Sequence, residues 1–206
     1  MKPYVVAMTG ASGVVYGRRC VEILAELGHK IVLVVSRSAR LILTEELHIP
    51  PGDFTRVEHF TCMFRPDILE HLKVYSPDEF TSPLASGSYP IQGMIIIPCS
   101  MRTLGAIASG AGENLIHRAA DCTIKEGRPL ILVPRETPLH AIHLENMLRL
   151  ARLGVRIVPA APAFYGGVQS FDGMIDFVVG KVFDQLGLEH ALSPRWIGSE
   201  CWTRSD

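Results

Sequence analysis

The chain has 206 residues, of which 48% are hydrophobic and 20% charged, and its net charge is −1. This length suits one domain, and this hydrophobicity excludes a disordered chain and favours extra buried surface in an oligomer. A nucleic-acid partner is not expected, because no excess of cations is available for a phosphate backbone. A membrane protein is not expected either, since no stretch approaches the roughly 18 apolar residues of a membrane helix.

Cysteine usage and the amino terminus indicate a reducing compartment. The five cysteines are scattered, odd in number and without a C-x-x-C pair. This favours reduced thiols in the cytoplasm over a disulfide framework or a zinc site. Residues 1–10 combine one lysine with a very short apolar run, which predicts a strand rather than a secretion signal.

Apolar periodicity predicts alternating strands and helices along the chain. In chain order these are a strand at 4–8, a helix at 14–27, a strand at 31–35, helices at 36–47 and 66–73, a loop at 76–92, a strand at 94–97, helices at 101–109 and 114–126, a strand at 130–133, a helix at 138–153, a strand at 155–158 and a helix at 171–186. Five or more strands alternating with helices predict an α/β fold, a single doubly wound parallel sheet with helices on both faces. One domain is expected to span residues 1–206.

In such a sheet, ligands bind beyond the carboxyl ends of the strands. The loop after the first strand, Thr9-Gly10-Ala11-Ser12-Gly13, leads into a helix whose free N–H groups suit a phosphate. It lacks the G-x-G-x-x-G dinucleotide pattern and the lysine of a Walker A loop, so a mononucleotide such as FMN fits better than NAD. The alternative is a tight turn with a serine cap.

A second such segment, Pro98-Cys99-Ser100-Met101-Arg102-Thr103, also places hydroxyls at a helix start. Taken alone, this segment is better explained by an ordinary serine N-cap. Cys99 is interpreted as a buried structural cysteine, because no base stands beside it in the sequence.

Charged residues follow the strand at 130–133. Arg135 and Glu136 lie between two prolines, where an arginine suits phosphate and a glutamate suits proton transfer. A local surface salt bridge is the alternative. Arg118 and Lys125 share a helix face, which fits either a phosphate or simple solvation. His140 and His143 lack a third ligand at helical spacing, so no metal is expected there.

Six segments, in this order, resemble the UbiX-type flavin prenyltransferases, a family formerly described as aromatic acid decarboxylase subunits. They are Gly10-Ala11-Ser12-Gly13, Cys99-Ser100-Met101, Asn114-Leu115-Ile116-x-Arg118-Ala119-Ala120-Asp121, Leu132-Val133-Pro134-Arg135-Glu136-Thr137-Pro138, His143-Leu144-Glu145-Asn146-Met147 and Pro159-Ala160-Ala161-Pro162-Ala163-Phe164-Tyr165. The resemblance runs from about residue 3 to Trp196.

The resemblance implies a flavodoxin-like subunit of a homo-oligomer, typically a dodecamer, with FMN at a subunit junction. It implies transfer of a dimethylallyl group from dimethylallyl phosphate to N5 of reduced FMN, followed by ring closure onto C6, without a metal. The prenylated FMN would pass to a UbiD-type decarboxylase.

The resemblance also implies residue roles. FMN binding is implied for Gly10, Ala11, Ser12, Ser36, Ser100, Met101, Arg102, Thr103 and Arg118. Binding of the prenyl phosphate is implied for Ser86, Gly87, Lys125, Arg135, Glu136, Tyr165, Lys181 and Trp196. The catalytic residues would be Ser12, Arg135 and Glu136, with Glu136 handling protons, and the segment from about 187 to 206 would cover the site.

Two positions depart from some relatives, Lys181 for an arginine and Phe80 for a tryptophan. Three other functions compete: an FMN-dependent cysteine decarboxylase, an aromatic acid decarboxylase acting alone, and an FMN carrier. The P-x-M-N-x-x-M-W signature of the cysteine decarboxylases is absent from the sequence. A carrier needs no proton-handling carboxylate such as Glu136.

Overall fold

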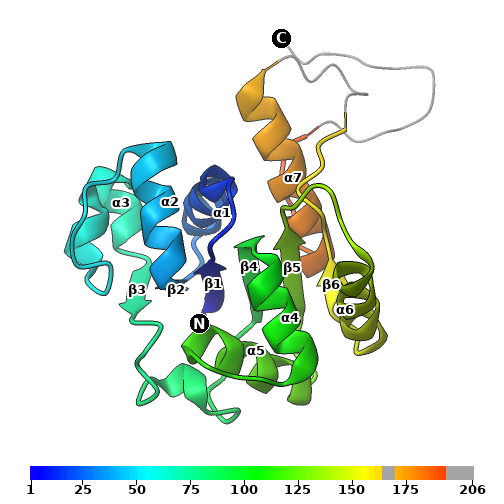
Figure 1. Ribbon diagram of the computed structural model, residues 1–206. Coiled ribbons are helices and arrows are strands. Elements are labelled where there is room, and N and C mark those ends of the chain that lie inside the picture. The colour runs from blue at the N-terminus through cyan, green and yellow to red at the C-terminus, as the bar shows by residue number, and fades with distance from the viewer. Residues whose placement is uncertain (164–169, 194–206) are drawn as a thin grey trace.

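Strands and helices alternate along the chain in the computed structural model, which describes residues 1–163 and 170–193 (Figure 1). The elements are β1 (Tyr4–Met8), α1 (Val14–Glu26), β2 (Ile31–Val35), α2 (Arg37–Leu47), the 3-10 helix η1 (Val57–Cys62), α3 (Pro66–Leu69), β3 (Leu72–Tyr75), the 3-10 helix η2 (Pro83–Ala85), β4 (Gly93–Cys99), α4 (Met101–Ser109), α5 (Leu115–Lys125), β5 (Leu130–Pro134), α6 (Ala141–Arg152), β6 (Arg156–Ile157) and α7 (Phe171–Leu186).

Six strands form one sheet in the order β3-β2-β1-β4-β5-β6, and every pair is parallel. The predicted fold class is therefore confirmed. The direction in which successive strands are added reverses between β1 and β4, and the helices that follow these two strands, α1 and α4, pack on opposite faces of the sheet. A crevice at the carboxyl ends of β1 and β4 is the place where such sheets bind ligands.

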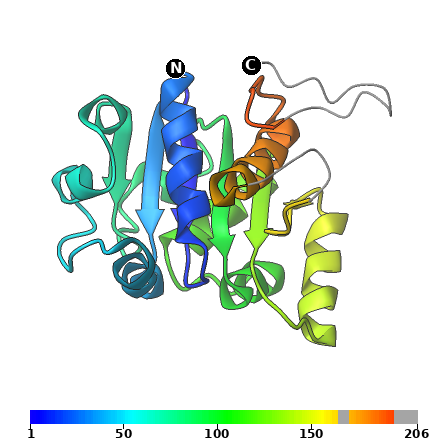
Figure 2. The ribbon, with the colours of Figure 1, turned by 90° about the horizontal axis from the view of Figure 1, so that it is seen from above.

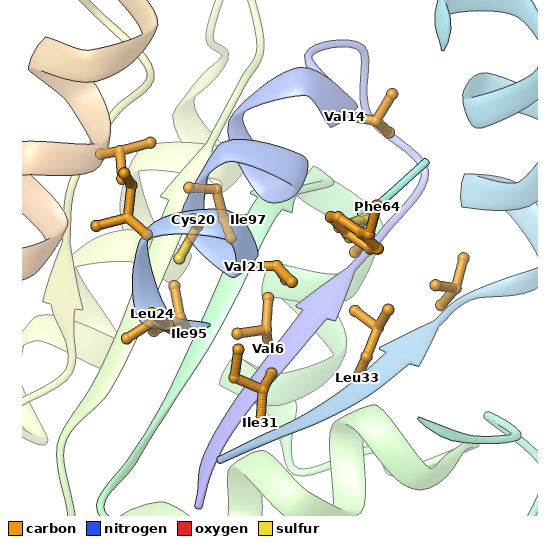
Figure 3. Packing of buried hydrophobic residues seen from close by; sticks show 14 of the residues in the cluster. Val6, Val14, Cys20, Val21, Leu24, Ile31, Leu33, Phe64, Ile95 and Ile97 are labelled. Atoms are coloured by element: carbon orange, nitrogen blue, oxygen red, sulfur yellow. The ribbon is translucent and has the colours of Figure 1, made fainter. Parts of the chain in front are cut away.

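Alternate residues of each strand enter two separate cores, one on each face of the sheet. Val6 of β1 and Ile95 of β4 pack with α1, α2, α3 and α7 (Figure 3). Their neighbours Val5 and Ile96 pack with α4 and α5 on the other face. Figure 2 shows α1 and α7 side by side on the first face. Burial on both faces explains why the central strands are uniformly apolar.

One predicted element is wrong. The sequence predicts a helix over 66–73, but the helix ends at Leu69 and Leu72–Tyr75 forms the edge strand β3. This strand pairs with β2 over four residues, from Leu72 beside Ile31 to Tyr75 beside Val34. Lys73 interrupts the apolar residues of β3, so local periodicity does not reveal this strand. The hydrogen bonds between β3 and β2 determine the extended conformation.

Three helices that begin on the carboxyl side of the sheet have a side-chain cap, whereas α1, which follows Gly13, has none. Ser36, Ser100 and Asn114 accept hydrogen bonds from backbone N–H groups three residues further on, at the starts of α2, α4 and α5. These caps fix where each helix begins, and they leave other N–H groups of the first turns available. Within residues 1–163 and 170–193, every helix is too short or too polar to cross a membrane.

Candidate functional site

The starts of α2, α4 and α5 surround a hollow of about 560 Å³, here called the polar hollow. Its walls are formed by Ser36, Arg37, Ser38, Pro77, Asp78, Ser100, Arg102, Thr103, Glu113, Asn114 and His117. Three helix N-termini and several hydroxyls make this surface suitable for an anion, and its two guanidinium groups are paired with carboxylates, Arg37 with Asp78 at 3.0 Å and Arg102 with Glu113 at 3.5 Å. Four of the sequence-predicted FMN residues, Ser36, Ser100, Arg102 and Thr103, are brought together here.

Gly10 lies against Ser38, one of the residues that line the polar hollow. A Cβ atom at this position would overlap the side chain of Ser38. Only glycine allows the loop after β1 to approach the first turn of α2 so closely. The hydroxyl oxygens of Ser36 and Ser38 lie 3.3 Å apart. Ala11 and Met101, two further predicted FMN residues, are buried beneath the surface.

Thr9, which the sequence analysis did not single out, fastens the loops after β1 and β4 together. Its buried hydroxyl donates to the carbonyl of Pro98 at 2.9 Å and accepts from the backbone N–H of Ser100 at 2.8 Å. The start of α4 is therefore fixed relative to the Gly10 loop. No sequence motif distinguishes this threonine from any other residue at a strand end.

A second hollow of about 500 Å³, here called the α1 hollow, lies at the start of α1. It is lined by Ser12, Gly13, Val15, Tyr16, Glu46, Leu47, Arg135, Ala160 and Phe171. Arg135 Nε donates to the backbone carbonyl of Ser12 at 3.1 Å. Two of the predicted catalytic residues, Ser12 and Arg135, are thus in contact although they are 123 positions apart.

Glu46 is the second residue that sequence reasoning missed. Its carboxylate accepts from the backbone N–H of Gly13 at 2.9 Å and of Val14 at 3.2 Å, both through Oε2. Gly13 has φ of 97°, a left-handed conformation that turns these amides toward the carboxylate. Glu46 lies in the last turn of α2, so only the packing of α2 across the Gly10–Gly13 loop brings it to the site.

Arg135 and Glu136 have different partners, so the structure does not show the local salt bridge that was the alternative. Arg135 is half-buried against Ser12, whereas the exposed Glu136 accepts from the backbone N–H of Thr137 through Oε1 at 3.1 Å. The carboxylate of Glu136 is therefore accessible, which suits proton transfer, but only its sequence neighbour Arg135 lines the α1 hollow.

Arg118 and Lys125 face one segment of the chain, as their spacing predicts. Arg118 Nε donates to the carbonyl of Ala85 at 3.0 Å, and a Cβ atom on Gly87 would lie 3.0 Å from Lys125 Cε. Arg118 also binds Asp121 at 2.8 Å and borders a third hollow of about 470 Å³ between α4 and α5, here called the α4–α5 hollow. Within one copy of the chain, Arg118 therefore lies outside the polar hollow.

The predicted prenyl-phosphate residues Ser86, Gly87 and Lys125 lie at the opposite edge of the sheet from Ser12. Arg128, just before β5 begins, donates to the carbonyl of Gly87 at 2.8 Å. Parallel strands all begin at one edge and end at the other, so this group lies where the strands begin. Ser12 and Arg135 lie where they end.

Another predicted residue, Lys181, is not brought into this group. Lys181 Nζ lies 3.1 Å from Asp184 Oδ2 and is ten residues, or roughly 15 Å of helix, from Phe171 at the α1 hollow. Tyr165 and Trp196 lie outside the described residues.

Several reactive side chains are accounted for by the fold. Cys99 is fully buried, and desolvation raises the pKa of its thiol far above the usual range, which fits a structural cysteine. The rings of His140 and His143 stack with centroids 3.4 Å apart. Over residues 1–163 and 170–193, no three His, Cys, Asp or Glu side chains gather as metal ligands would.

The chain is similar to proteins of a known family. The chain matches the Flavoprotein family over residues 1–183. It is 49% identical over 193 residues to the flavin prenyltransferase UbiX of Halalkalibacterium halodurans, covering 94% of this chain and 92% of that one. The chain belongs to the UbiX family of flavin prenyltransferases. The resemblance inferred from the six sequence segments is thus confirmed.

Two solved structures of the UbiX family are similar along their whole length. A UbiX protein in complex with FMN and dimethylallyl pyrophosphate is 38% identical, with a TM-score of 0.84, covering 97% of this chain and 99% of that one. A dodecameric FMN-dependent UbiX-like decarboxylase from Escherichia coli is 40% identical, with a TM-score of 0.82, covering 96% and 100%.

Proposed function

We propose that the protein is a flavin prenyltransferase that transfers a dimethylallyl group from dimethylallyl phosphate to N5 and C6 of reduced FMN. The observation that carries this proposal is the pair of hollows at the carboxyl ends of β1 and β4. One presents three helix N-termini, and the other presents Ser12 and Arg135, with the exposed Glu136 next to Arg135 in the sequence. The UbiX relatives are flavin prenyltransferases, and the residues of the two hollows suit that reaction.

The residues present fit FMN. The polar hollow offers hydroxyl groups from Ser36 and Thr103, helix N-termini and the exposed Arg102, a donor set for a phosphate monoester. Its volume of about 560 Å³ lies in the range of small-molecule sites. Gly10 and Ala11 would let the rest of the nucleotide approach the backbone toward Ser12.

The side chains of the α1 hollow would act on the prenyl donor. When bound, reduced FMN supplies the nucleophilic nitrogen and carbon. Arg135 would hold the phosphate as the allylic C–O bond breaks, because a cation stabilises the charge that develops on the leaving group. Glu136 would take up the proton released when the new ring closes, and Ser12 would orient the reacting face. Cation binding by protein side chains would make a metal ion unnecessary.

The remaining predicted prenyl-phosphate residues require a second copy of the chain. Ser86, Gly87 and Lys125 lie at the other sheet edge, and Arg118 faces the α4–α5 hollow. A neighbouring subunit would bring this edge to the Ser12 edge, so FMN would lie at a subunit junction. Lys181, Tyr165 and Trp196 would complete the site, with residues 187–206 of the single 1–206 domain covering it.

One surface supports the oligomer. Five large apolar side chains on or beside α6 are exposed, namely Leu139, Ile142, Leu144, Leu148 and Leu153. Figure 1 shows α6 at the edge of the molecule, beyond the edge strand β6. Leu144 and Leu148, four positions apart, share one side of the helix, and exposed apolar side chains that gather in this way mark an interaction surface. We propose a homo-oligomer, a dodecamer like the UbiX-like relative.

The prenylated FMN would serve a UbiD-type decarboxylase in the cytoplasm. Neither a nucleic acid nor a membrane would be a partner, in keeping with the net charge of −1.

Anaerobic incubation with reduced FMN and dimethylallyl phosphate, followed by mass spectrometry of the released flavin, tests the function. We expect the flavin to gain one isoprene unit. A parallel reaction with dimethylallyl pyrophosphate identifies the donor. Unmodified but tightly bound FMN from both reactions would refute the transferase and favour a carrier or a decarboxylase acting alone.

A further inference from the structure

His117, in the first turn of α5, is a polar side chain that the fold leaves with one unused hydrogen-bond donor. Its ring forms part of the wall of both the polar hollow and the α4–α5 hollow. The residue is only 6% exposed. Buried polar groups in folded proteins are almost always hydrogen-bonded, so each nitrogen of this ring should have a partner.

The position of the ring proton follows from one contact. The backbone N–H of Glu113 donates to Nδ1 of His117 at 3.3 Å. Nδ1 therefore carries a lone pair, and a neutral ring must hold its proton on Nε2. Burial holds the pKa of this imidazole below its usual value, with the charge of Arg102 acting in the same direction and that of Glu113 opposing it. The ring is neutral at pH 7, with Nε2–H as its donor.

The donor on Nε2 has no acceptor within the described part of the chain, where the Glu113 contact is the ring's one hydrogen bond. Nε2 is not enclosed by protein atoms, so it borders open space. The neighbouring caps are already satisfied: Ser100 pairs with Thr103, and Asn114 accepts from the backbone N–H of His117. The donor of Nε2 is thus available to a ligand.

We propose that His117 Nε2–H donates a hydrogen bond to a phosphate oxygen of the flavin nucleotide in the polar hollow. The assignment rests on the proposed function, which places a flavin nucleotide there. The starts of α2, α4 and α5 direct backbone N–H groups toward this space, so the anionic end of the nucleotide belongs beside His117. The exposed Arg102 lies there too, paired with Glu113 at 3.5 Å. A neutral donor binds a phosphate without disturbing the Glu113 contact that orients the ring.

Two substitutions separate ligand binding from a structural role. In His117→Gln the amide nitrogen replaces Nε2 as a donor, while the acceptor for Glu113 is lost. In His117→Asn the amide oxygen replaces Nδ1 as that acceptor, while the outward donor is lost. Dissociation constants of both variants and of the wild type are measured for FMN and for riboflavin, which lacks the phosphate, and a thermal melt confirms that each variant folds.

We expect His117→Asn to bind FMN about tenfold more weakly, the loss typical of one hydrogen bond to a charged group, and riboflavin as the wild type does. His117→Gln should stay within about twofold of the wild type for both ligands. Weakening in His117→Gln but not in His117→Asn would overturn the proposal, because only the Glu113 contact would then matter. Equal weakening for both ligands would overturn the assignment to phosphate. A wild type that binds riboflavin but not FMN would do the same, whereas binding of neither would refute the proposed function itself.

Discussion

Glu46 and Glu136 have different hydrogen-bond partners, and these partners suit the two carboxylates to different roles. The Glu46 carboxylate is bound to two backbone amides at the start of α1. The Glu136 carboxylate has one contact, with the backbone N–H of the next residue. A carboxylate occupied by amides stabilises structure, whereas one with free lone pairs can accept a proton.

Glu136→Gln should keep the flavin and lose most of the product. The amide preserves size and polarity but cannot take up a proton, and removal of a general base typically costs 10²- to 10⁴-fold in rate. Flavin content after purification and prenylated flavin after incubation provide the two measurements. Glu145→Gln, an exposed glutamate on α6, serves as the control. Unchanged turnover in Glu136→Gln would remove this residue from the chemistry.

Glu46→Gln should lower stability in a way that depends on salt. A negative charge at a helix N-terminus is favourable by about 0.5 kcal/mol at a surface and is screened by salt. Urea unfolding at low ionic strength should therefore show a lower midpoint for the variant. The difference should shrink in 1 M salt. An equal difference at both ionic strengths would show that the charge of Glu46 contributes nothing at this position.

At the residue level, sequence reasoning located the part of the site that follows strands. Ser36, Ser100 and Arg135 stand directly after β2, β4 and β5, so the alternation of strands and helices alone indicates them. Glu46 comes from the far end of α2, and Thr9 acts through hydrogen bonds to Pro98 and Ser100. Both contacts depend on how distant segments pack, which periodicity does not encode.

At the level of elements, long apolar segments were predictable and short mixed ones were not. The five residues of β1, β2 and β5 are buried throughout, and α4 and α7 have the predicted bounds. In contrast, β3 has only four residues, and its pairing with β2 determines its conformation. Tertiary pairing outweighs local preference at such an edge.

The middle of α7 gives a prediction about packing. A glycine inside a helix normally costs about 1 kcal/mol relative to alanine. Gly180, however, leaves room for the buried ring of His190, since a Cβ atom there would lie 2.9 Å from His190 Cε1. The ring accepts from the N–H of Leu192 through Nδ1, so it carries its proton on Nε2 and donates it to Asp184.

Gly180→Ala should therefore lower the thermal midpoint, whereas Gly105→Ala in α4 should raise it. At Gly105 the nearest atom to an added Cβ would be Asn146 Nδ2 at an ordinary 3.5 Å. The gain of about 1 kcal/mol at this position corresponds to roughly 2–4 °C for a chain of this size. A higher midpoint in both variants would show that the His190 ring moves aside without cost.

At the level of the whole molecule, the exposed face of α6 is the feature that a single copy does not explain. Leu148→Glu would place a charge where a neighbouring copy should exclude water, so the oligomer should dissociate into smaller species. Leu41→Glu on α2 is the matched control, because Leu41 is 72% exposed against 51% for Leu148. Molar mass by light scattering distinguishes the two. Equal assembly of both variants would place the subunit contact elsewhere.

If FMN lies at the proposed subunit junction, the separation of Lys125 and Gly87 from Ser12, at opposite edges of one sheet, would make catalysis a property of pairs of chains. An oligomer assembled from two defective variants, one altered at each edge, would contain some junctions where two intact edges meet. Such variants would complement each other, although neither is active alone. A chain altered at both edges would instead act as a dominant inhibitor, since each junction it enters would lack one half of the site.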